Sequence, residues 1–163
     1  STGTLYNYFP TKGDLLVAIV ALETVHTLDA GNAIISNPPR DANDAVLALA
    51  RAWYEHSFRL LDRRLWRHAF AMMMERPRSQ SSVRFAQNDQ LMQDQAAALI
   101  TALQAQGNAR ADMDAADAGL CVFNLIDRTF MTYISDDEMR SEQLNEVCFH
   151  ILLNAAAISL VCS

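Results

Sequence analysis

The chain has 163 residues, a formal net charge of −6 at pH 7 and a hydrophobic content of 51%. This length is sufficient for one substantial hydrophobic core, and the scarcity of glycine and proline favours an all-α fold. The negative net charge argues against nucleic-acid binding by these residues alone, because DNA affinity depends largely on the neutralisation of phosphates.

The sequence shows no signal-peptide pattern and no membrane span. Its longest apolar run, residues 151–162, is too short and too often interrupted by polar residues to cross a bilayer. The cysteines lack the close spacing of a zinc site and predict small buried thiols in a reducing compartment. They are Cys121, Cys148 and Cys162. We therefore expect a cytoplasmic protein that contacts no membrane.

The first sixteen residues read STGTLYNYFPTKGDLL. Pro10 restricts Phe9 to extended geometry, so a short helix that begins at about Thr2 should end just before the proline. Thr11 has the position of an N-cap for the next helix, and Asp14 stands three residues later as its capping-box partner. The segment therefore predicts a short helix, a tight turn and the start of a longer helix.

This segment resembles the end of the helix-turn-helix in TetR/AcrR-family transcriptional regulators, where the pattern G-T-L-Y-x-Y/H-F-x-x-K-x-x-L-L recurs. The resemblance implies a set of DNA-contacting residues, with the lysine meeting a phosphate. They are Thr2, Gly3, Thr4, Tyr6, Asn7, Tyr8 and Lys12. The alternative is that the two tyrosines merely cover a hydrophobic patch. A helix-turn-helix also needs a helix before the recognition helix, so we expect a chain that lacks the first two helices of its DNA-binding domain.

Amphipathic periodicity predicts six further helices. The first runs over residues 12–29, with an apolar face formed by Leu15, Ile19, Leu22 and Val25 or His26, and ends before a loop marked by Gly31, Asn32, Pro38 and Pro39. The others are expected at about residues 43–61, 62–74, 82–106, 115–134 and 137–161, with 78–82 as a polar loop. We predict Asp41 or Asn43 as the cap of the helix that ends near Leu61.

The segment between residues 107 and 114, GNARADMD, provides a second match. It resembles the G-x-x-R-x-D-x-D turn that precedes the last two helices in many TetR-type proteins, so the resemblance extends along the whole chain. It implies an all-α protein of two units. Residues 1–29 are expected to be a remnant of the helix-turn-helix domain, and residues 30–163 a helical domain for effector binding and dimerisation.

The last predicted helix carries apolar residues at alternating spacings of four and three, which is a heptad seam. The seam consists of Leu144, Cys148, Ile151, Ala155 and Ile158. The resemblance implies that the last two helices pair with their copies in a second subunit to form a four-helix bundle. The alternative is that both helices are central in a monomeric core. A second apolar flank beside the seam favours the homodimer.

The resemblance also implies a pocket for a small-molecule effector among the middle helices. Its expected lining combines aromatic, Met and polar residues, a combination that suits apolar ligands. It consists of Trp53, His56, Phe70, Met73, Met74, Phe123, Asn124 and Arg128. Asn124 and Arg128 share a helix face, where together they can orient a carbonyl or carboxylate. In the alternative, Asp127 or Arg128 forms an ion pair across the dimer interface, and His56 is an ordinary core histidine.

Patterns of catalysis and metal binding are missing from the sequence. It contains no G-x-S-x-G, no H-E-x-x-H and no glycine-rich phosphate loop, so we expect no enzyme and no cofactor. Residues 72–74 are consecutive methionines that point in different directions on a helix, so they cannot converge on one metal ion with His68 and Cys121.

The function implied by the resemblance is a ligand-responsive transcriptional regulator, most often a repressor in this family. Such a protein binds operator DNA as a dimer and releases it when a small-molecule effector binds. The alternative is a helical dimerisation or adaptor module that does not bind DNA.

We predict that the 163-residue chain forms a dimer but binds no operator, because a three-helix DNA-binding module cannot close without its first two helices. Size-exclusion chromatography and fluorescence anisotropy with operator DNA test the two halves of this prediction. Tight, sequence-specific DNA binding by this chain would contradict it.

A second prediction concerns the heptad seam. The substitution Ile151→Asp places a charge at a predicted helix-helix contact, so it should produce monomers or aggregates. Sedimentation velocity distinguishes these species from the dimer. An unchanged dimer would place the interface elsewhere.

Overall fold

The computed structural model describes residues 8, 9 and 11–154, and all elements in these residues are helices. The elements are α2 (Lys12–Ser36), α3 (Ala42–Leu60), α4 (Arg63–Glu75), α5 (Gln80–Ala105), α6 (Ala115–Ser135) and α7 (Ser141–Asn154). The prediction of an all-α fold is confirmed. None of these helices is both long enough and apolar enough to cross a membrane.

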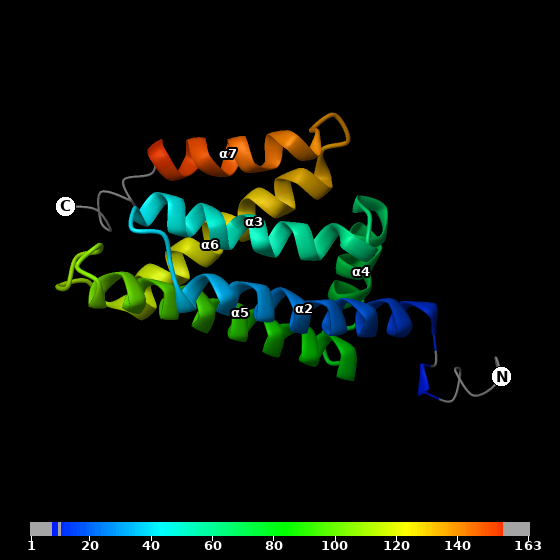
Figure 1. The fold of residues 1–163 in the computed structure, drawn as a ribbon. Helices are drawn as coiled ribbons and strands as arrows, with labels where there is room; N and C mark the ends of the chain where they lie inside the picture. Colours follow the sequence, from blue (N-terminus) through cyan, green and yellow to red (C-terminus); the bar gives the residue numbers. More distant parts are fainter. Residues whose placement is uncertain (1–7, 10, 155–163) are drawn as a thin grey trace.

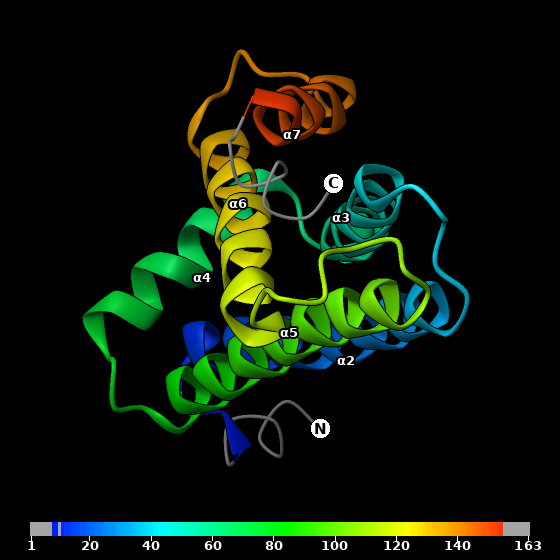
Figure 2. The ribbon, with the colours of Figure 1, turned by 90° about the vertical axis from the view of Figure 1, so that its left-hand side faces the viewer.

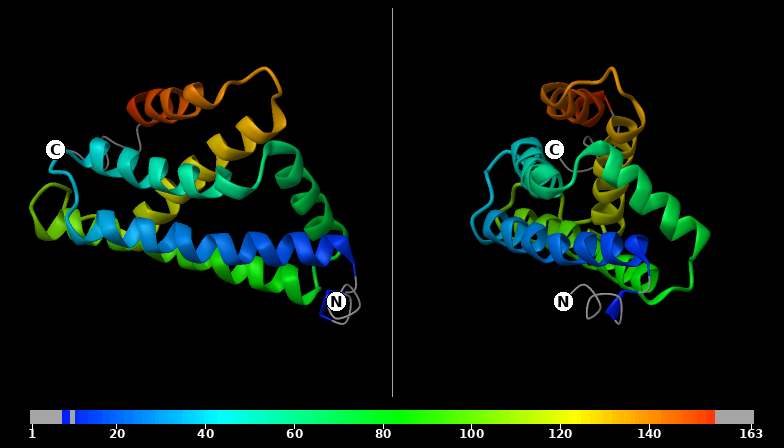
Figure 3. Two further views of the ribbon diagram at one scale, coloured as in Figure 1. Left: turned by 45° about the vertical axis from the view of Figure 1, so that its right-hand side comes forward. Right: turned by 90° about the vertical axis from the view of Figure 1, so that its right-hand side faces the viewer.

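The helices α2 and α5 run side by side along the length of the protein (Figure 1). The helix α6 packs on α5 and crosses toward α7, which lies over α3 and α6 (Figure 2). The short helix α4 closes one end of the assembly, next to the start of α2 and against α6 (Figure 3). The hydrophobic core between these helices contains Val20, Leu49, Trp53, Leu99, Ile100, Leu103 and Ile134, all 2% exposed or less.

Side-chain caps set the starts of five helices, and two of these caps, Thr11 and Asp41, were expected from the sequence. The caps are Thr11, Asp41, Asp62, Ser79 and Asp114, and each accepts a hydrogen bond from a backbone N–H in the first turn. Such caps satisfy donors that have no partner within the helix. The capping box predicted at the start of α2 is present. The helices expected at 62–74 and 115–134 end within one residue of their observed limits.

The expected end of the first long helix near residue 29 was wrong, because α2 continues to Ser36. Gly31 and Asn32 are helical rather than part of a loop. A Cβ atom on Gly31 would lie 1.9 Å from Oε1 of Gln95, so the glycine serves the close approach of α5. Asn32 accepts a 2.8 Å hydrogen bond from Nε2 of the same glutamine. The helix ends only where the following prolines prevent it from continuing.

The apolar face expected for α2 was also wrong in part, because Leu22 and Val25 are 61% and 51% exposed. The buried face consists of Val17, Val20, Glu23, Thr24, Thr27 and Gly31. Its threonine hydroxyls donate hydrogen bonds to backbone carbonyls one turn earlier, which makes their burial tolerable. Glu23 forms an ion pair with Arg59 of α3 at 3.5 Å.

The helices α5 and α6 approach each other closely at Gly119. A Cβ atom built on this residue would lie 2.4 Å from the backbone nitrogen and 2.5 Å from the Cα of Ala97. Backbone atoms cannot move aside as a flexible side chain can. The missing side chain is therefore a condition for the packing of α6 on α5.

We predict that Gly119→Ala destabilises the protein by about 1–3 kcal/mol, although alanine is the better helix former, because the two helices must move apart. Ala116→Ser, at an exposed position of the same helix, is the control and should change stability by less than about 0.5 kcal/mol. Urea unfolding followed by circular dichroism measures both. A more stable Gly119→Ala variant would show that this contact does not limit the packing.

Candidate ligand-binding cavity

A cavity of about 60 Å³ lies between α2, α3, α4, α5 and α6. Its lining consists of Thr24, Thr27, Trp53, Tyr54, Ser57, Trp66, Phe70, Phe85, Asp89, Met92, Phe123, Ile126, Asp127 and Phe130. A volume of this size holds a small chemical group or a few water molecules. A larger ligand therefore requires side chains to move, and Phe70, Phe85 and Met92 are only half-buried.

Aromatic residues from four helices make up half of the lining residues. The ring centroids of Trp66 and Phe130 are 5.1 Å apart at an interplanar angle of 88°, and those of Phe70 and Phe85 are 5.7 Å apart at 82°. These edge-to-face arrangements are favourable for aromatic pairs. The rings of each pair are therefore nearly perpendicular to each other. Both tryptophans of the chain, Trp53 and Trp66, belong to the lining.

The buried amide of Gln95 fixes the position of Trp53. The indole Nε1 of Trp53 donates a 2.8 Å hydrogen bond to Oε1 of Gln95, and Nε2 of Gln95 donates to the carbonyl of Leu28 at 2.7 Å. The amide thereby joins α3, α5 and α2 behind the cavity. Sequence reasoning missed Gln95. The available signal was a polar residue four positions before Leu99, on the apolar face of α5.

Tyr54 also lines the cavity and links two of the helices around it. Its hydroxyl donates a 2.9 Å hydrogen bond to the backbone carbonyl of Ile126, which joins α3 to α6. Burial raises the pKa of Tyr54 far above its usual range, so the phenol remains neutral. Its role in the cavity is therefore that of a fixed, uncharged wall.

Two carboxyl groups from different helices line the same cavity, Asp89 from α5 and Asp127 from α6. Burial raises the pKa of Asp89 to about 6, and the charge of Asp127 adds to the effect. Partial burial of its carboxyl also raises the pKa of Asp127, although that residue is otherwise exposed. Within the described part of the chain, neither carboxyl group forms an ion pair or accepts a hydrogen bond.

The structure brings three of the eight expected ligand-binding residues to the cavity, namely Trp53, Phe70 and Phe123. The other five lie elsewhere. Met73 is buried in the core, Met74 is 78% exposed, and Asn124 and Arg128 lie on the exposed face of α6. His56 is half-buried, and its Nδ1 has no hydrogen-bond partner among the described residues. The sequence pattern correctly placed Asn124 and Arg128 on one face, but this face points away from the cavity.

The structure describes only some of the residues expected to bind DNA or to form the dimer seam. Thr2, Gly3, Thr4, Tyr6 and Asn7 lie outside the described residues, whereas Tyr8 and Lys12 are exposed. In the expected seam, Leu144 and Cys148 are buried within the chain itself, where α7 packs on α3 and α6. Ile151 lies in α7, and Ala155 and Ile158 lie outside the described residues.

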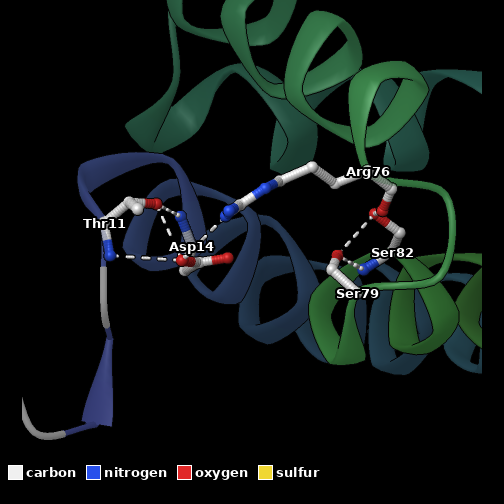
Figure 4. Close-up of polar contacts among 5 residues, drawn as sticks. All are labelled: Thr11, Asp14, Arg76, Ser79 and Ser82. Carbon is white, nitrogen blue, oxygen red and sulfur yellow. Dashed lines mark hydrogen bonds and ion pairs between the residues drawn. The ribbon is translucent and has the colours of Figure 1, made fainter.

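A polar cluster joins the start of α2 to the turn between α4 and α5 (Figure 4). The carboxylate of Asp14 accepts hydrogen bonds from the backbone and hydroxyl of Thr11 at 3.1 and 2.7 Å, and lies 3.7 Å from Arg76. The carbonyl of Arg76 accepts a 2.9 Å hydrogen bond from Ser82, whose backbone N–H donates to the α5 cap, Ser79. The cluster thereby couples the first turn of α2 to two other helices.

No protein family, curated protein or solved structure matches the chain. The described residues contain no group of three or more His, Cys, Asp or Glu side chains that could hold a metal ion. Of the two described cysteines, Cys148 is buried as expected for a small apolar side chain. Cys121 is exposed, so its expected burial was wrong.

We predict that Asp89→Asn changes the pH dependence of stability. The folded protein keeps the Asp89 proton up to about pH 6, whereas the unfolded chain releases it near 3.8, so this residue lowers stability as the pH rises between these values. Asp89→Asn should therefore stabilise the protein at neutral pH, by at most about 3 kcal/mol, and have little effect near pH 4.

Urea unfolding at several pH values measures this effect. Asp94→Asn is the matched control, because Asp94 lies on the same helix, is exposed and does not line the cavity. Equal pH dependence in the Asp89→Asn variant and the control would show that the Asp89 carboxyl is hydrated like one at the surface.

Proposed function

We propose that the chain is the effector-binding part of a TetR-type transcriptional regulator that acts as a dimeric repressor and releases DNA when a small molecule binds. The observation that carries this proposal is that one helix belongs to both the cavity and the N-terminal motif. Thr24 and Thr27 of α2 line the cavity, and the same helix begins at Lys12, within the segment that resembles the TetR motif.

The contacts of α2 support a mechanical connection between these two regions. At one end, the Thr11–Asp14 capping box and the Asp14–Arg76 ion pair hold its first turn. At the other end, Gln95 binds the carbonyl of Leu28. A ligand that enlarges the cavity must therefore displace α2 or the helices that hold it. A preference of a few kcal/mol for the displaced arrangement is sufficient to change operator occupancy.

Dimerisation is part of the same proposal. The outer face of α6 carries Leu120, which is 42% exposed, together with exposed Asn124 and Arg128. Because α7 packs beside α6, these two helices provide a continuous surface at one side of the protein. A two-fold dimer formed there would place two recognition helices on the same side of a DNA duplex.

The test starts from the natural full-length protein and a random pool of DNA. We expect in vitro selection to enrich a two-fold symmetric sequence, and we expect binding of this sequence in a mobility-shift assay to weaken as the salt concentration rises. An adaptor module would enrich no sequence, and that result would contradict the proposal.

Variants of the full-length protein that fill the cavity test the connection to DNA binding. Thr27→Phe on α2 and Ser57→Phe on α3 both extend into the cavity and should weaken operator binding about tenfold or more, because they imitate a bound ligand. His26→Phe is the control, because His26 is an exposed neighbour on α2. Unchanged operator affinity in both folded cavity variants would separate the cavity from DNA binding.

A further inference from the structure

We propose that the cavity binds an organic cation, an amine or quaternary ammonium compound with an aromatic or alkyl body. The cationic group lies between Asp89 and Asp127, and the body packs against Trp66, Phe70 and Phe130. This inference rests on the proposed function of the cavity as the effector site, and it specifies the chemical class of the effector.

The first observation is the arrangement of charge. Asp89 and Asp127 come from two different helices and line one cavity, and no cationic side chain is among its lining residues. Two negative charges in the same partly dehydrated space are unfavourable, because each is desolvated and each repels the other. A ligand cation would interact favourably with both carboxylates. A neutral ligand would leave them without partners, and an anion would be repelled.

The second observation is the aromatic wall. The faces of aromatic rings carry negative electrostatic potential and attract cations, most strongly when water is excluded. The cavity has rings from α3, α4, α5 and α6, so a cation near the carboxylates also lies close to several rings. Aromatic rings together with carboxylates are a favourable environment for alkylammonium groups, which expose apolar carbon around a positive charge.

The composition of the cavity argues against a metal ion as the occupant. Calcium requires six to eight oxygen ligands, and magnesium requires nearly ideal octahedral coordination. The cavity offers two carboxyl groups among mostly apolar side chains. Its present volume of about 60 Å³ accommodates a small ammonium group, and the half-buried Phe85 and Met92 must move to admit a longer body.

The test uses two probes of the same shape, benzyltrimethylammonium and its uncharged carbon analogue neopentylbenzene. Trp53 and Trp66 are the only tryptophans of the chain and both line the cavity, so their fluorescence reports on its occupancy. We expect benzyltrimethylammonium to bind about tenfold or more tightly than neopentylbenzene, which corresponds to one favourable charge interaction in a partly buried site.

Variants at the two carboxyl groups locate the effect. Asp89→Asn and Asp127→Asn should each weaken binding of the cation about fivefold or more and leave the affinity for neopentylbenzene nearly unchanged. The controls are Asp94→Asn on α5 and Asp117→Asn on α6, which neutralise exposed carboxyl groups outside the cavity lining. Equal effects of the cavity variants and the controls would show that only the net charge of the protein matters, and would overturn the proposal.

The pH dependence of binding gives an independent readout. The titratable groups that line the cavity are Asp89 from α5, Asp127 from α6 and Tyr54 from α3, while α2 and α4 contribute only uncharged residues. Affinity for the cation should rise between about pH 5 and pH 7 as Asp89 loses its proton. The affinity for neopentylbenzene should remain constant, and Asp89→Asn should remove most of the rise.

The outcomes distinguish this inference from the proposed function. Equal binding of both probes, or tighter binding of neopentylbenzene, would overturn the cation site and leave the cavity as an effector site. Binding of neither probe would overturn the cation site and count against the cavity as an effector site. Tight binding of the cation without any change in operator affinity of the full-length protein would support the cation site and contradict its regulatory role.

Discussion

The arrangement of this protein depends on one buried amide, the side chain of Gln95, which joins α5 to both α2 and α3. It accepts a hydrogen bond from Trp53 and donates to Leu28 and Asn32. Loss of such partners leaves a buried polar group unsatisfied, at a cost of about 1–3 kcal/mol. The amide fits only because Gly31 has no Cβ atom. The spacing of three helices and the orientation of a cavity tryptophan therefore follow from the same contact.

The cavity next to this amide departs from the rules that govern the rest of the core. Elsewhere the hydroxyl of the buried Thr129 donates a hydrogen bond to a backbone carbonyl, and the buried Glu23 lies within 3.5 Å of an arginine. At the cavity, two carboxyl groups face aromatic rings, and burial raises the pKa of both. Such an arrangement lowers the stability of the unliganded protein. Local departures of this kind are concentrated at functional sites, and the proposal of a cationic occupant rests on this one.

The sequence predicted the features that depend on contacts between neighbouring residues, and it missed those that depend on contacts between residues distant in the sequence. The starts of α2, α4 and α6 depend on a cap and the next few residues, so the local sequence was sufficient to predict where they begin, with Thr11 as the predicted cap of α2. The end of α2 was mispredicted because Gly31 suggests a loop. The glycine instead makes room for the side chain of Gln95, a residue distant in the sequence. The orientation of α6 was similarly inaccessible, because the spacing of Asn124 and Arg128 shows a shared face but not which neighbour that face meets. Asp89 and Asp127 line one cavity only because α5 packs on α6, so their proximity could not be read from the sequence.

The unequal strength of the contacts at the two ends of α2 determines how this helix can respond to a ligand. Near its C-terminal end, Leu28 and Asn32 accept hydrogen bonds of 2.7 and 2.8 Å from a buried amide. At its N-terminal end, α2 packs against Met72 of α4 at Gly13, and its ion pair with another segment is the 3.7 Å pair of Asp14 with Arg76, whose side chain is 53% exposed. Such solvent-exposed pairs contribute at most about 1 kcal/mol. The polar contacts at the N-terminal end of α2 are therefore weaker than those at its C-terminal end. The N-terminal end is the one next to the segment with the TetR-like pattern, so under the proposed function a movement of α2 there would couple the cavity to DNA without any change in the core around Gln95.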